Sequence, residues 1–204
     1  MIDLLVGGLL TFVSLCIAAV FVQSAVFSRA LGVSTLLSLV DDTTSTAIFG
    51  LLLTVVTTIG GVLNWLANAY LLSGFAYAYY IRPLCMVLCM SAAYLLVFVI
   101  VIKFAPYAKL QKAIDTLPLA TFNCAAVGTL LVTTTMQLNL FSTICYSIGM
   151  GLGFVLSVLL VTEGQRKIQN ESTPVAFRGL PVTLLYIAGF ALAVYGLLGY
   201  TLLG

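Results

Sequence analysis

Charged side chains are scarce in this chain, and histidine is absent. The 204 residues include 8 Lys and Arg and 6 Asp and Glu, so that 7% are charged while 62% are hydrophobic. An ordinary soluble domain carries roughly 25% charged residues because its surface faces water. The composition, with a mean hydropathy of +1.21, therefore excludes an ordinary soluble domain and indicates an integral membrane protein.

The lack of histidine and of any C-x-x-C pair limits the metal chemistry of the chain. A zinc site or a catalytic Cys-His pair cannot be built from these residues alone. Every cysteine falls within a predicted membrane span, where a disulfide framework is not expected; they are Cys16, Cys85, Cys89, Cys124 and Cys145. Cys85 and Cys89 share a helix face, and small fillers at a helix contact are their simplest interpretation.

Six apolar runs approach or exceed the roughly 20 residues that a helix needs to cross a bilayer. They lie near 4–28, 46–64, 84–104, 117–136, 141–162 and 180–203. The stretch from Trp65 to Ile81 is rich in Tyr and Trp, which favour the headgroup level, so we interpret it as an interfacial connector and not a seventh span. The sequence predicts an all-α integral membrane protein with six transmembrane helices in a single membrane domain, 1–204.

The positions of the basic residues predict the orientation of the chain in the membrane. Seven of the eight fall on the first, third and fifth connections: Arg29, Lys103, Lys109, Lys112, Arg166, Lys167 and Arg178. Lys and Arg near span ends are retained on the cytoplasmic side, so both termini are expected on the outer side. No basic segment precedes the first apolar run, and we expect that run to remain as a helix.

Two polar breaks interrupt the apolar runs. Asn123 and Cys124 lie in the run 117–128, and the segment from Ser28 to Ser34 interrupts the first run. Polar atoms at membrane depth need partners, so we expect the two breaks to meet near the midplane. The hydroxyl groups of the run 133–135 are expected to bond back to their own helix.

The order of these features predicts an internal repeat. Ser34 in the first break and Cys124 in the second are 90 residues apart. The spans that follow each break begin 95 residues apart (46 and 141) and then 96 residues apart (84 and 180). A unit with an odd number of spans enters the membrane from opposite sides in its two copies. We therefore predict an inverted three-plus-three repeat, with halves of about 1–105 and 106–204 and with broken first and fourth helices.

Four blocks of the sequence resemble the family of membrane subunits shared by the Rnf complex and the sodium-pumping NADH:quinone oxidoreductase, Nqr. LPLATFNCAAVG (117–128) is similar to the family pattern L-P-L-I-T-x-N-C-A-V-x-G. PVAFRGLP (174–181) is similar to V-P-x-x-F-R-G-x-x, GLGF (151–154) matches a third block, and ALGVS (30–34) aligns with F-L-G-[LM]-C. The four blocks occur in the family order and at the family spacing.

The resemblance implies a membrane subunit of an ion-translocating electron transport complex in a bacterial or archaeal cytoplasmic membrane. It would pair with a homologous sister subunit of the Rnf E or Nqr D type, beside flavin-bearing and Fe-S subunits. In that family each sister supplies one cysteine from each broken helix, and the four thiolates hold a [2Fe-2S] cluster that relays electrons across the membrane, coupled to Na⁺ or H⁺ translocation. The corresponding cofactor-binding positions are Cys124 and Ser34 as iron ligands, with Asn123 and Gly32 beside them.

The first of these ligand positions departs from the family pattern, because Ser34 stands where the family has cysteine. A serine alkoxide is a harder and more basic ligand for iron than a thiolate. Three outcomes are open: a cluster with one oxygen ligand, a cluster completed by another group, or a structural paralogue that has lost the cluster.

A different class of function is also open. Inverted repeats and broken helices are typical of small secondary transporters.

The chain carries no soluble nucleotide domain and no ferredoxin-like cysteine run. As part of a redox translocase it would therefore be an electron conduit without a complete active site of its own.

Overall fold

The computed structural model describes residues 43–72, 78–104, 107–168 and 179–198, together with Ser14 and Thr35. Within these ranges every regular element is a helix. The elements are α3 (Thr43–Ala67), the π-helical turn η2 (Asn68–Leu72), α4 (Ala78–Phe104), α5 (Tyr107–Thr121), α6 (Cys124–Thr135), α7 (Leu140–Ile168) and α8 (Leu180–Leu198).

Three of these helices are long and apolar enough to cross a membrane: Thr46–Leu71, Tyr80–Lys103 and Leu140–Lys167. The bent pair Gln111–Thr121 and Cys124–Thr135 makes a fourth when it is counted as one span, and α8 contains the shorter apolar segment Leu180–Val194. The all-helical membrane architecture is thus confirmed. Apart from Ser14, the run 4–28 lies outside the described residues, and the six-helix repeat stays a prediction.

Helices α3 and α7 form the centre of the described structure, and they pack against each other through small residues. A Cβ atom added to Gly61 would lie 3.1 Å from Ser147 Oγ, and one added to Gly151 would collide with Thr54. Residues of increasing number along α3 contact residues of decreasing number along α7, so the two helices are antiparallel. Small residues allow this close approach in membranes. An inverted repeat predicts such antiparallel packing for the second helices of its halves.

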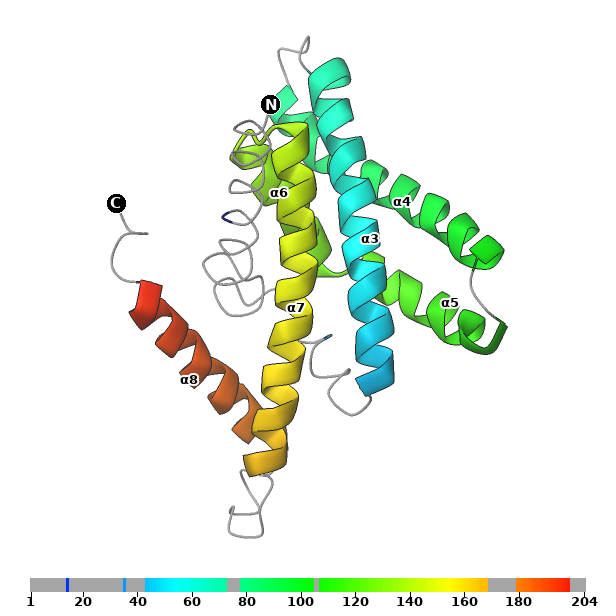
Figure 1. Cartoon of the computed structure of the whole chain (residues 1–204). Helices are drawn as coiled ribbons and strands as arrows, with labels where there is room; N and C mark the ends of the chain where they lie inside the picture. The colour runs from blue at the N-terminus through cyan, green and yellow to red at the C-terminus, as the bar shows by residue number, and fades with distance from the viewer. Residues whose placement is uncertain are drawn as a thin grey trace, which may run out of the picture.

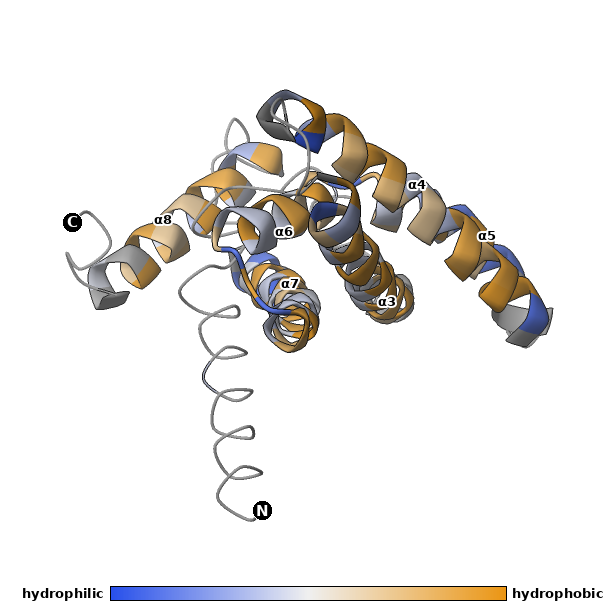
Figure 2. Cartoon of the chain, turned by 90° about the horizontal axis from the view of Figure 1, so that it is seen from above, coloured by the Kyte–Doolittle hydropathy of each residue, from blue (hydrophilic) through white to orange (hydrophobic). Residues whose placement is uncertain are grey.

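The other helices flank this central pair. Figure 1 shows α3 and α7 side by side, with α4 and α5 on one side and α8 on the other. Between α3 and α7 the rings of Phe49 and Phe154 pack with centroids 5.3 Å apart. Seen from above, the flanking helices α4 and α8 are coloured mainly as apolar (Figure 2), and they carry many exposed large side chains.

Polar contacts join the end of α7 to the start of α8. Gly179 precedes α8 with a φ of +87°, a left-handed conformation that glycine adopts without strain. Thr183 donates to the Gly179 carbonyl (3.0 Å) and accepts from Gln165 Nε2 (2.6 Å). These bonds fix how α8 leaves the central pair.

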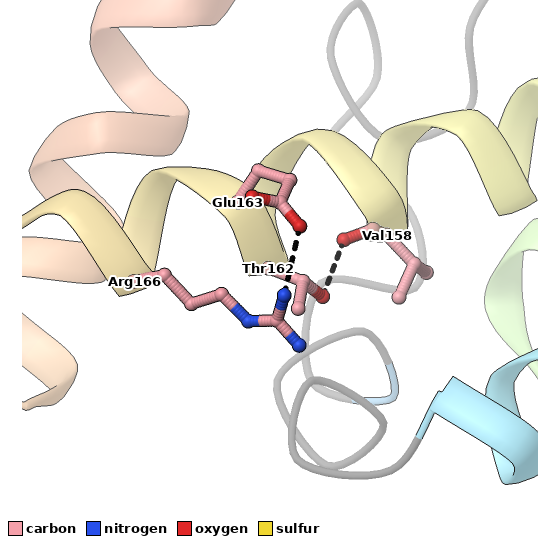
Figure 3. A network of polar contacts seen from close by, with 4 residues as sticks. All are labelled: Val158, Thr162, Glu163 and Arg166. Atoms are coloured by element: carbon pink, nitrogen blue, oxygen red, sulfur yellow. Dashed lines mark hydrogen bonds and ion pairs between the residues drawn. The ribbon is translucent and has the colours of Figure 1, made fainter.

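The last turns of α7 also carry an exposed ion pair. Arg166 lies 3.1 Å from Glu163, and Thr162 donates to the Val158 carbonyl at 2.8 Å (Figure 3). Because both charged side chains are exposed, such a pair adds little to stability.

The predicted bounds of the aromatic connector are wrong. Helix α3 continues past Trp65 to Ala67 and into η2, and α4 already begins at Ala78. The amide of Asn68 donates to the carbonyl of Asn64 (2.8 Å). A side chain that occupies a backbone acceptor competes with the helical ladder, which accounts for the local widening into a π turn.

Candidate functional site at a helix break

Helices α5 and α6 are separated by a break at Phe122 and Asn123, where the sequence predicted a break. The two segments are bent by 48°. Asn123 has extended backbone angles (φ −89°, ψ 141°), and its Oδ1 accepts from Ala125 N at 3.2 Å. Asparagine is a preferred N-cap because its side chain can accept from a free N–H of the first turn. Asn123 therefore begins α6 as a new helix.

The other end of the Asn123 amide has no partner among the described residues. The side chain is 3% exposed, and Nδ2 is buried without a hydrogen-bond acceptor in that part of the chain. A buried donor without an acceptor costs about 1–3 kcal/mol. The helix break thus contains a buried donor whose hydrogen bond is not formed within the described residues.

Cys124 follows as the first residue of α6, and its side chain is exposed. The next two residues, Ala125 and Ala126, are buried and hold this end of α6 against the core. Phe122, 61% exposed, packs near Tyr94 of α4 with ring centroids 6.0 Å apart. At the break, the Cys124 thiol is therefore exposed on the surface of the chain. It follows the Tyr94–Phe122 ring pair and begins a helix whose next two residues are buried.

This arrangement fits a metal centre only if other ligands join Cys124. In the part of the chain that the structure describes, no group of three or more His, Cys, Asp or Glu residues could hold a metal ion. A thiolate is a soft ligand suited to iron. The exposed Cys124 thiol fits one ligand of a centre shared with another segment or chain.

The other two predicted site residues, Ser34 and Gly32, are outside the described residues, so the meeting of the two breaks stays a prediction. Cys85 and Cys89 are half-buried in α4.

A second feature was not predicted: an open cavity of about 370 Å³ at one end of α3. We call it the end cavity. Its lining comes from α3, η2, α4, α6, α7 and the α6–α7 turn: Gly61, Asn64, Trp65, Asn68, Ala69, Arg82, Thr133, Thr134, Gln137, Leu138, Asn139 and Thr143. In the sequence, amide side chains and Arg82 stand out in an otherwise apolar chain, and these residues could have predicted a polar site.

The wall of the end cavity is held by an interhelical hydrogen bond. Asn64 Nδ2 donates to Thr134 Oγ1 at 2.8 Å, which ties α3 to α6. Thr134 itself donates to the Leu130 carbonyl (2.8 Å), and Thr133 donates to the same carbonyl (3.0 Å). Thr135 bonds back to Leu131 (2.9 Å). The predicted back-bonding of these hydroxyl groups is confirmed.

Known proteins resemble this chain over nearly its whole length. The family model described as "Rnf-Nqr subunit, membrane protein" matches residues 12–202. The A subunit of the Na(+)-translocating ferredoxin:NAD(+) oxidoreductase complex of Acetobacterium woodii is 28% identical over 194 residues, which is 95% of this chain and 100% of that protein. The A subunit of the ion-translocating oxidoreductase complex of an Azoarcus species is 28% identical over 188 residues, covering 92% of this chain and 96% of that protein.

Proposed function

The chain belongs to the Rnf-Nqr family of membrane subunits, and on this premise we propose that it is the A-type subunit of an ion-translocating oxidoreductase complex. Two relatives named as A subunits of such complexes align with more than nine-tenths of the chain. In such a complex this chain would act as a membrane conduit for electrons in a redox-driven ion translocase, with Na⁺ or H⁺ as the transported ion. It would have no complete active site of its own.

The exposed Cys124 at the helix break is the observation that supports an electron-carrying role for this subunit. We propose that its thiolate is one ligand of a [2Fe-2S] cluster shared with a homologous sister subunit, of the Rnf E or Nqr D type. Such a cluster, when bound, supplies a one-electron carrier between a donor on one side of the membrane and an acceptor on the other. A single thiol that is exposed on the surface of the chain can reach a cluster whose other ligands come partly from a second chain.

Asn123 would support the same site. Its Oδ1 holds the first turn of α6 in place, and its Nδ2 is a buried donor without a partner among the described residues. A donor beside a metal-bound sulfur stabilises the negative charge that the sulfur carries. Asn123 is therefore proposed as a positioning residue.

Ser34 is proposed as the second ligand position of this chain, with Gly32 in the same block. An oxygen ligand there would lower the reduction potential of the cluster and weaken its retention, because an alkoxide is harder and more basic than a thiolate. The same residue favours a second candidate function, a structural paralogue that braces the complex without a cluster.

Iron analysis and electron paramagnetic resonance of the complex purified from membranes test these proposals. We expect the natural chain to co-purify with iron, a rhombic signal of a reduced [2Fe-2S] centre, and a sister subunit. Cys124→Ser should lose most of the iron, whereas Ser34→Cys should hold iron at least as well as the natural chain.

Cys85→Ser is the matched control, because Cys85 is a half-buried thiol in a different membrane helix. Its iron content and signal should match those of the natural chain. Equal iron in Cys124→Ser and Cys85→Ser would sink the ligand assignment. A stable complex without iron in the natural chain would favour the structural paralogue.

A transporter remains a separate proposal with its own requirement. It needs a substrate cavity near the membrane centre. Where α3, α6 and α7 meet, the space lined by Thr57, Ala125, Thr129 and Gly151, among others, has no room for a water-sized molecule. The end cavity lies at the helix ends, so neither of these two spaces, both lined by described residues, is a substrate cavity near the membrane centre.

A further inference from the structure

The end cavity combines a rare charge with buried polar atoms that lack partners. Nε of Arg82 and Oδ1 of Asn68 are buried and have no hydrogen-bond partner among the described residues. The orientation of the Asn68 amide is fixed, because its Nδ2 donates to the carbonyl (2.8 Å) and to Oδ1 (3.2 Å) of Asn64. The cavity therefore offers one charged donor and one acceptor to a ligand.

The electrostatics of the cavity favour an anion. Among the described residues that line it, Arg82 is the only charged one, and the other polar side chains are neutral amides and hydroxyls. A lone guanidinium repels a metal cation, but it donates several hydrogen bonds in a planar fork that suits phosphate oxygens.

The position of the cavity favours a ligand from the membrane surface. It lies at the end of α3, at the start of α4 and beside the α6–α7 turn. Trp65 lines it, and the neighbouring segments carry Tyr70 (78% exposed) and Tyr80 (79% exposed). Exposed Trp and Tyr side chains are typical of the headgroup level of a bilayer.

The size of the cavity is also suitable. Its volume of about 370 Å³ greatly exceeds the ~30 Å³ share of one water molecule in the liquid. The space can therefore hold a phosphate group together with the small alcohol attached to it.

We propose that the end cavity binds the headgroup of a phospholipid, with the phosphate accepting from Arg82. A headgroup that carries a donor, such as an ethanolamine ammonium or a glycerol hydroxyl, would also donate to Asn68 Oδ1. The predicted topology puts this end of the helices on the outer face, where basic residues are otherwise sparse, so the ligand would come from the outer leaflet. This proposal does not depend on the cluster or on the electron-transfer role.

Native mass spectrometry of the full chain, purified in mild detergent with its co-purifying subunits, tests the proposal. The natural protein should retain a phospholipid adduct after detergent exchange. Arg82→Gln should reduce that adduct by about tenfold, the effect expected from losing one charge-assisted hydrogen bond. Lys103→Gln is the matched control, because Lys103 is an exposed basic residue at the other end of α4, and its adduct should be unchanged.

A second variant keeps the test informative if Arg82→Gln is unstable. Asn139→Asp puts a carboxylate among the residues that line the cavity, where it should repel a phosphate. Asn139 directly precedes α7 and its carbonyl accepts from Thr143 N at 2.8 Å, an N-cap position at which Asp is as well accepted as Asn. The variant should therefore remain folded and retain less of the adduct than the natural chain.

Titration with defined ligands identifies the source of the phosphate. Phosphatidylethanolamine or phosphatidylglycerol in nanodiscs should raise the melting temperature of the natural protein more than that of Arg82→Gln. Stabilisation by inorganic phosphate alone would overturn the assignment to a lipid. Equal phospholipid retention by the natural chain and Arg82→Gln, or a protein subunit seated against Arg82, would overturn the proposal as a whole.

Discussion

The central helices α3 and α7 and the flanking helix α4 can all cross a membrane, yet they differ in burial. Within their most apolar windows, 50% of α3 and 61% of α7 are buried, against 22% of α4. Helix α4 is the most hydrophobic of the three helices, and it is also the least buried. Its exposed surface is built from large side chains such as Leu88, Leu95 and Val99. Lipid is as apolar as leucine, so helix contacts in membranes depend on close packing and hydrogen bonds.

The sharpest test of this contrast is Gly151→Leu in α7. A Cβ at this position collides with the side chain of Thr54 and reaches its Cα, so the central helices must move apart. We expect a loss of more than about 3 kcal/mol in unfolding free energy, or failure to yield a monodisperse protein.

Gly189→Leu in α8 is the control, because a Cβ there meets nothing within 4 Å. It should leave the elution profile in detergent and the melting temperature nearly unchanged. If both variants behave alike, α3 and α7 do not pack as described.

A smaller effect is expected from Phe154→Ala. Phe154 is 2% exposed and packs against Phe49. Its loss should cost about 2 kcal/mol, less than the ~3–5 kcal/mol typical of soluble cores, because the surrounding lipid is also apolar. Leu95→Ala on α4, where the side chain is 61% exposed, should change stability by less than about 0.5 kcal/mol. Denaturation in mixed micelles, followed through the fluorescence of Trp65, compares the two; equal losses would contradict the contrast.

The smallest effect concerns the hydrogen bond between α3 and α6. Asn64→Leu removes the donor to Thr134 and also the Oδ1 that accepts a longer bond (3.2 Å) from Asn68, and it should lower the unfolding free energy by about 1 kcal/mol, within the range measured for interhelical bonds in membranes. Ser91→Ala removes a hydroxyl that only bonds back to the Val87 carbonyl of its own helix. The same fluorescence assay should show little change for Ser91→Ala, and a neutral Asn64→Leu would show that this bond adds no stability.

Much of the architecture could be predicted from sequence because apolar runs and caps are local. The runs 84–104 and 141–162 fall within α4 and α7. The break at Asn123 was predictable because an asparagine in an apolar run must satisfy its amide nearby, and capping a new helix does so.

Other features could not be predicted because they depend on contacts between distant residues. The bond between Asn64 and Thr134 spans 70 positions, and no local pattern shows which helix Asn64 faces. The end cavity has the same origin, since its lining is assembled from four helices, a π turn and a loop. The aromatic segment after Trp65 was misassigned because interfacial composition does not reveal where a helix ends.

The break between α5 and α6 has an electrical consequence. The last carbonyl groups of α5 and the first N–H groups of α6 lie on either side of Asn123, so the negative pole of one helix macrodipole faces the positive pole of the next. Cys124 stands on the positive side, where a negative charge is favoured by about 0.3–1 kcal/mol. The fold thus places a fixed local field beside Cys124, and in the proposed electron relay this field would attract a negative charge at the Cys124 sulfur without any movement of the backbone.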